Sequence, residues 1–217
     1  WVSAPLELCR RRKAPEYTRA YARIAYALEL HEHLAAEAWA AGLAYACSVY
    51  LPGDVPLIAP FCHYLKCASF EAGDPDMREA LWPYRGKTIV SLGMGADPSP
   101  WLGYFARLHC ISAYSAPIAE MNLAALRNTR VNGLSDHSRH PWAGALAVAA
   151  GAQIVEFHVR LDDTDPRNAD YAVSRSPEEA RAYVANIRTA EAMLGDGVRR
   201  VMPSEQEYLR FRVRATP

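Results

Sequence analysis

The 217-residue sequence lacks several features that would restrict its function at once. It has no net charge, because 24 Lys and Arg residues balance 24 Asp and Glu residues, so nothing in the charge favours nucleic acid or an anionic membrane as a partner. The charge-free stretch over 141–155 is shorter than the roughly 20 residues of a membrane-spanning helix. The sequence opens without a signal peptide. We therefore expect a soluble, cytoplasmic protein.

The cysteines also lack a pattern. There are five, an odd number, and no two form a CxxC pair. This argues against a disulfide framework and against a zinc cluster, so the sequence predicts free thiols in a reducing compartment. With 51% hydrophobic residues, 15 Pro and 12 Gly, the composition is that of a globular domain, neither disordered nor fibrous.

Short apolar segments alternate with helical ones along most of the chain. The pattern predicts six strands, at 43–47, 64–68, 88–92, 108–112, 131–135 and 153–159. Helices are expected at 15–41, 76–82, 119–127, 141–150 and 176–195. The last of these has the clearest ends, because Ser176 and Glu179 form a capping-box pattern and Gly195 follows the final turn.

Strands that alternate with helices predict a parallel sheet, because parallel strands need crossover connections. A doubly wound nucleotide-binding sheet and a (β/α)8 TIM barrel are the two alternatives. The cluster Gly93-Met94-Gly95 lacks the third glycine of a dinucleotide-binding turn, which disfavours the first. We therefore expect an α/β protein with a (β/α)8 barrel whose first two strands lie outside the sequence, which begins with Trp1 rather than Met.

Polar residues cluster where the predicted strands end, which is where a barrel builds its active site. Lys66 lies in an apolar strand of a chain that has only three lysines, and a buried lysine needs an anion nearby. His137 follows the predicted strand 131–135 and His158 lies near the end of the next one, 153–159. Such a pair of imidazoles suits a transition metal that acts as a Lewis acid. Glu71 is placed for acid or base catalysis, or to pair with Lys66.

Five short motifs at these strand ends resemble the sialic acid (N-acetylneuraminate) synthase family, whose enzymes condense phosphoenolpyruvate with an amino sugar. They are K-C-A-S-F-E from Lys66, S-L-G-M from Ser91, H-C-I-S-A-Y from His109, S-D-H from Ser135 and E-F-H from Glu156. The five occur in the family's order and at compatible spacings. Together they are far more specific than any single motif.

The resemblance implies a barrel with a divalent metal, manganese or else magnesium or cobalt, held between His137 and His158. It implies catalytic roles for Glu71 and Lys66, and sugar contacts from Asp170 and Tyr114. The residues that it implies for phosphoenolpyruvate binding are Lys66, Ser69, Ser91, Asn122 and Ser135. The implied product is a 2-keto-3-deoxy sugar acid, made with release of phosphate by an enzyme that we expect to be a homodimer.

Other features leave the exact function open. Tyr171 stands where the family has histidine, and the connection over 95–107 is short, which favours an acceptor other than N-acetylmannosamine. A non-catalytic barrel descendant that serves binding or assembly is the alternative, and a generic metal-dependent aldolase fits less well because it needs no phosphate site. We expect residues 1–197 to form a partial barrel domain and 198–217 a linker, with the family's antifreeze-like domain absent.

Overall fold

The structure is a computed structural model that describes residues 28–128 and 130–213. Six parallel strands form one sheet: β1 (Ala46–Val49), β2 (Tyr64–Cys67), β3 (Thr88–Leu92), β4 (Ala106–Cys110), β5 (Gly133–Asp136) and β6 (Ile154–Phe157). The strands lie side by side in the order in which they occur along the chain. A doubly wound sheet would reverse this order at a switch point, so that alternative is excluded for the described strands.

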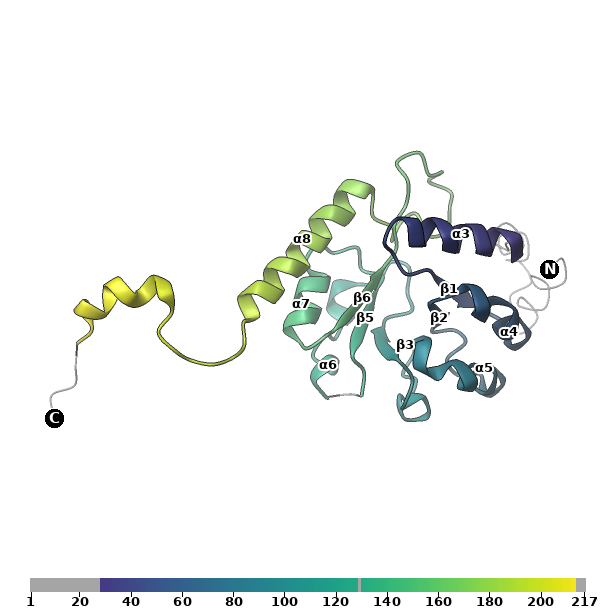
Figure 1. Cartoon of the computed structure of the whole chain (residues 1–217), viewed down its shortest axis with the longest axis horizontal. Coiled ribbons are helices and arrows are strands. Elements are labelled where there is room, and N and C mark those ends of the chain that lie inside the picture. The colour runs from purple at the N-terminus through teal and green to yellow at the C-terminus, as the bar shows by residue number, and fades with distance from the viewer. Residues whose placement is uncertain (1–27, 129, 214–217) are drawn as a thin grey trace.

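The helices lie around the outside of this sheet (Figure 1). α3 (Leu28–Ala40), α4 (Val55–Ile58) and α5 (Pro75–Leu81) lie near the first strands, and α6 (Ala125–Asn128), α7 (Ala143–Ala149) and α8 (Pro177–Leu194) near the last ones. Short 3-10 turns fill several connections: η2 (Pro52–Asp54), η3 (Ala59–Phe61), η4 (Trp82–Lys87), η5 (Ser99–Trp101) and η6 (Ile118–Glu120). A further turn, η7 (Pro203–Phe211), lies beyond α8 and apart from the sheet (Figure 1).

The sheet is strongly curved. Lys66 Nζ on β2 lies 3.4 Å from Glu156 Oε2 on β6, although three strands separate them. In a flat sheet the two backbones would lie about 19 Å apart, at ~4.8 Å for each strand spacing, which is beyond the combined reach of the two side chains. The described strands therefore form a curled half-barrel, in which β1 and β6 each have one neighbouring strand.

Two apolar clusters fill the space between the sheet and the helices. One includes Val55 and Ile58 of α4, Met77 and Leu81 of α5, and Leu65 of β2. The other joins Leu134 of β5 to residues of α6, α7 and α8. In this second cluster a side chain at Gly144 would come within 2.8 Å of the Tyr183 ring, so α7 and α8 approach closely only because position 144 is glycine.

Most of the predicted elements are present, with shifted ends. The strand at 88–92 is confirmed in full, whereas the first strand begins at Ala46 instead of 43 and the fourth at Ala106 instead of 108. The prediction of a single helix at 119–127 was wrong. The segment is divided into η6 and α6, because Asn122 has a φ of +42°, outside the right-handed helical region. The N-terminal part of the helix predicted at 15–41 lies outside the described residues.

The predicted ends of the last helix are confirmed. The N–H of Glu179 donates to Ser176 Oγ, and the Glu179 carboxylate accepts from the N–H of Ser176 at 2.8 Å. Gly195 follows the helix with a φ of +57°. In the part of the chain that the structure describes, no helix is long and apolar enough to cross a membrane.

We expect Ser176→Ala to lower the free energy of unfolding by about 1 kcal/mol, because it removes the oxygen that accepts the N–H of Glu179. Urea-induced unfolding followed by circular dichroism measures the change. Ser204→Ala is the control, because Ser204 is exposed and lies outside this cap. An equal loss in both variants would show that the cap contributes nothing particular.

Candidate active site

The first part of the site lies on the concave face of the sheet, around Lys66. This lysine is buried, and its Nζ donates to Ser91 Oγ on β3 at 2.8 Å and to the carbonyl of Cys67 at 3.2 Å. The Glu156 carboxylate lies opposite at 3.4 Å. Because register partners on adjacent strands face the same side, Ser135 points to this face beside Glu156. The energetic cost of burying the Lys66 ammonium group is thus offset by a carboxylate and by hydroxyl groups.

A pair of serines extends the polar face toward β4. Ser112 Oγ donates to Ser69 Oγ at 2.7 Å, which links the turns after β4 and β2. Gly93 follows β3 between them, and any Cβ there would clash with Ser112 Oγ. Glycine at position 93 is therefore required for this contact. Glu71 lies in the turn after β2 and is also buried.

The second part of the site is formed by two imidazoles at the carboxyl ends of β5 and β6. The His137 and His158 rings lie 5.2 Å apart between centroids. Nδ1 of His137 lies 2.9 Å from the carbonyl oxygen of Ile111. Since a carbonyl can only accept, this bond requires a proton on Nδ1 and leaves Nε2 of the neutral ring free to bind a metal.

Acidic and aromatic groups surround the imidazole pair. The Tyr114 ring stacks on His137 at 4.4 Å between centroids and meets the edge of His158 at 5.6 Å. Asp170 Oδ2 lies 3.8 Å from His158 Nδ1, and the Cys110 thiol lies 3.6 Å from His137 Nδ1. The four residues implied for metal and sugar contacts, Tyr114, His137, His158 and Asp170, therefore lie together.

The surroundings change the proton affinities of these groups. Burial would lower the pKa of His137, but the neighbouring Cys110 thiol and the carbonyl of Ile111 raise it above its ordinary value. For His158, burial outweighs the attraction of Asp170 and lowers the pKa, which favours the neutral, metal-binding form. Burial raises the pKa of Tyr114, so its hydroxyl keeps its proton.

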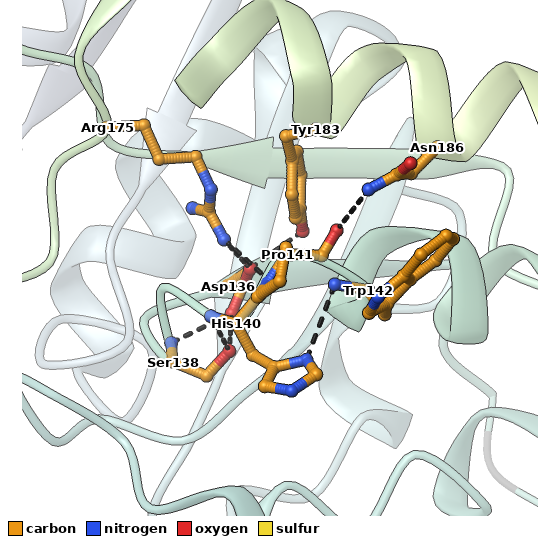
Figure 2. A network of polar contacts seen from close by, with 8 residues as sticks. All are labelled: Asp136, Ser138, His140, Pro141, Trp142, Arg175, Tyr183 and Asn186. Atoms are coloured by element: carbon orange, nitrogen blue, oxygen red, sulfur yellow. Dashed lines mark hydrogen bonds and ion pairs between the residues drawn. The ribbon is translucent and has the colours of Figure 1, made fainter. Parts of the chain in front are cut away.

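A buried polar network around Asp136, the residue before His137, lies on the helical side of the sheet (Figure 2). Side chains alternate along a strand, so Asp136 points away from the concave face that Ser135 faces. Its Oδ2 accepts hydrogen bonds from Arg175 Nη2 and from the Tyr183 hydroxyl, both at 2.7 Å. Its Oδ1 accepts from the N–H and hydroxyl of Ser138. Asp136 is fully buried and Arg175 is only 2% exposed.

One predicted residue is not part of the contacts described above. Asn122 is exposed at the break between η6 and α6, and its carbonyl accepts a hydrogen bond from the N–H of Ala125 at 2.9 Å. Several contributors were assigned no role from the sequence, namely Glu156, Ser112, Cys110 and Arg175. The first three stand inside the quoted motifs, whereas nothing in the sequence indicates Arg175.

The residues present fit a metal ion in part. Among residues 28–128 and 130–213, no group of three or more His, Cys, Asp or Glu side chains is arranged to hold one. Two adjacent imidazoles, one with its tautomer set by a backbone carbonyl, are nevertheless a suitable donor pair for a divalent transition metal. Water and substrate oxygens are suitable further ligands for such a metal.

Taken together, the curled parallel sheet and the polar groups at its carboxyl edge are typical of α/β enzymes that place their active site at the carboxyl ends of parallel strands. Comparison with known proteins is more specific. The NeuB family model matches residues 102–199. The resemblance to the sialic acid synthase family is thereby confirmed.

Individual relatives agree with this result. The chain is 34% identical over 150 residues to a pseudaminic acid synthase of Campylobacter jejuni, covering 61% of this chain and 43% of that protein. It is 28% identical over 167 residues to human N-acetylneuraminate-9-phosphate synthase, covering 67% of this chain and 46% of the relative. Both are named as synthases, the type of enzyme that the sequence predicts. The chain spans less than half of the length of these two curated relatives.

A solved structure supports the fold. N-acetylneuraminic acid synthetase from Leptospira borgpetersenii, in complex with citrate, superposes with a TM-score of 0.80 at 24% identity. The superposition covers 91% of this chain and 74% of the other. At this level of identity the likeness concerns the fold alone.

Asp136→Asn is expected to lower the free energy of unfolding by about 3 kcal/mol, because it leaves the Arg175 charge buried without its counter-ion. Thermal and urea unfolding provide the measurement. Asp165→Asn is the matched control, since its partner Arg167 is 90% exposed, and we expect a much smaller loss there. Similar losses in the two variants would contradict a stabilising role for the buried pair.

Proposed function

We propose that this protein condenses phosphoenolpyruvate with an amino sugar or sugar-like aldehyde to give a 2-keto-3-deoxy sugar acid and phosphate. The observation that carries the proposal is the juxtaposition, at one edge of the sheet, of a buried Lys66 bonded to Ser91 and an imidazole pair, His137 and His158. The first suits a phosphorylated anion and the second suits a metal that activates an aldehyde. The names of the relatives support the same reaction class.

The proposed architecture is a (β/α)8 barrel closed by two strands outside the described residues, which would lie between β6 and β1. In this arrangement residues 1–197 belong to the catalytic domain and 198–217 to a connecting segment. The sequential parallel order and the curvature of the sheet support it. We further propose a cytoplasmic enzyme that acts as a homodimer and has no nucleic-acid or membrane partner.

Lys66 and the hydroxyl groups form the proposed phosphoenolpyruvate site. Lys66 and Ser91 are already hydrogen-bonded, Ser69 is linked to Ser112, and Ser135 faces the same side of the sheet. A cation and several hydroxyl donors would stabilise the negative charge that grows on the phosphate as its bond to carbon breaks. Asn122 belongs to this proposal by the motif alone.

The imidazole pair and its neighbours form the proposed acceptor site. His137 and His158 would hold the divalent metal, manganese in preference to magnesium or cobalt, which when bound supplies electrophilic activation of the aldehyde. Tyr114 lies beside both rings and Asp170 lies beside His158, and these two residues would orient the sugar. Glu71 is buried near Ser69 along the chain and is proposed as the acid or base that moves a proton.

The reaction balances with one water molecule. The methylene carbon of phosphoenolpyruvate forms a bond to the aldehyde carbon, and the aldehyde oxygen gains a proton. Water adds to C2, the bond between C2 and the phosphate ester oxygen breaks, and inorganic phosphate leaves. The carbonyl at C2 then completes the keto acid.

The full-length gene product is expected to release phosphate from phosphoenolpyruvate with manganese and one acceptor from a panel of N-acetylated sugars and simpler aldehydes.

Lys66→Met should raise the KM for phosphoenolpyruvate at least tenfold and change the KM for the acceptor less, because Lys66 lies on the phosphate side. Lys87→Met is the matched control, since Lys87 precedes β3, at the amino end of the strand, and its Nζ donates to the carbonyls of Ala59 and Cys62. A larger effect on the acceptor would place the anion site elsewhere.

His137→Ala and His158→Ala should each abolish metal-dependent turnover while the protein remains folded, because each removes one of two proposed ligands. Turnover after chelation and titration with Mn2+, with circular dichroism as the folding test, measures this. His33→Ala, at an exposed position of α3, should behave as the unmodified protein. Full activity in either of the first two variants would refute the metal assignment.

A further inference from the structure

After β6 the chain forms a long loop that returns at Arg175, which lies beside residues 158–160 at the start of that loop. The N–H of Arg175 donates to the carbonyl of His158 at 2.9 Å, and the N–H of Arg160 donates to the carbonyl of Arg175 at 2.9 Å. Val159 and Arg175 form a parallel bridge. The backbone of Arg175 is therefore fixed to the segment that carries one of the two imidazoles.

The side chain of Arg175 reaches the strand that carries the other imidazole. Its Nη2 donates to Asp136 Oδ2 at 2.7 Å and to the carbonyl of His140 at 3.2 Å (Figure 2). Asp136 directly precedes His137, and His140 follows it by three residues. The guanidinium thus contacts the chain on both sides of His137.

The surroundings restrict the orientation of this guanidinium. It lies over the Tyr183 ring at 3.8 Å from the centroid, and over the Phe157 ring at 5.3 Å. Tyr183 in turn donates its hydroxyl to the same oxygen of Asp136. Nη2 of this planar group therefore has two hydrogen-bond partners and its faces have aromatic neighbours, whereas Nη1 is buried without a hydrogen-bond partner among the described residues. A lysine at this position would not reproduce the planar contacts.

We propose that Arg175 is a positioning residue that fixes the separation of the His137 and His158 imidazoles. It does so by joining the backbone beside His158 to the side chain beside His137. Thermodynamic stability alone is a weak reason for such a pair, because a buried ion pair is often no more stabilising than apolar residues of similar size. The inference rests on the proposed function only in so far as the imidazoles hold a metal.

The test is Arg175→Met in the full-length protein, with two measurements. The first is the affinity for Mn2+ alone, from the electron paramagnetic resonance signal of the free ion, and we expect a loss of about tenfold. The second is the position of the imidazole signals in 1H–15N spectra of the metal-free protein, where His137 and His158 should shift and His33 should not. Arg188→Met, which removes an exposed arginine paired with Glu191, is the control and should change neither.

A second variant separates positioning from stability. Asp136→Asn combined with Arg175→Met removes both charges, so it should unfold at a higher temperature than Arg175→Met, yet bind Mn2+ about as weakly and keep the shifted imidazole signals. Arg175→Lys should recover part of the affinity through one hydrogen bond to Asp136. Unmodified affinity and signals in the folded double variant would overturn the proposal. If the parent protein binds no Mn2+, the proposed function fails, and the imidazole signals alone decide the role of Arg175.

Discussion

The candidate site depends on the curvature of the parallel sheet. The ion pair between Lys66 and Glu156 is evidence of this curvature, because the two residues lie on strands that a flat sheet would hold far apart. Parallel connections place every carboxyl end at one edge, but in a flat sheet β2 and β6 would be too far apart to share a ligand. Curvature brings the polar ends of five strands around one concave face. The lysine with its hydroxyl partners and the two imidazoles then line one face, so the two reactants of the proposed condensation could lie next to each other.

Regular features were predictable from the sequence because they are local. Apolar segments of four to five residues predict the strands, and the capping box of Ser176 and Glu179 predicts the start of α8. The candidate residues at the strand ends, including Lys66, His137 and His158, follow from the same parallel arrangement together with the motif resemblance. The ends of the strands were predicted less accurately, because backbone pairing, rather than apolar content, decides where a strand begins.

Non-local features could not be predicted. Arg175 and Asp136 are 39 residues apart and belong to no common periodic pattern, so their pairing depends on how α8 and the return of the chain after β6 pack on β5. The break between η6 and α6 depends on a backbone angle at Asn122 that asparagine tolerates without requiring it. In both cases the residue type permits the structure, and tertiary packing selects it.

The close approach of α7 and α8 at Gly144 has a consequence beyond helix packing. A side chain at position 144 would meet the ring of Tyr183, whose hydroxyl is bonded to Asp136, the residue before His137. A methyl group added at this helix contact would therefore displace Tyr183 and disturb the hydrogen bonds of Asp136. The packing of the two outer helices and the position of an imidazole at the other face of the sheet therefore both depend on the absence of a side chain at position 144.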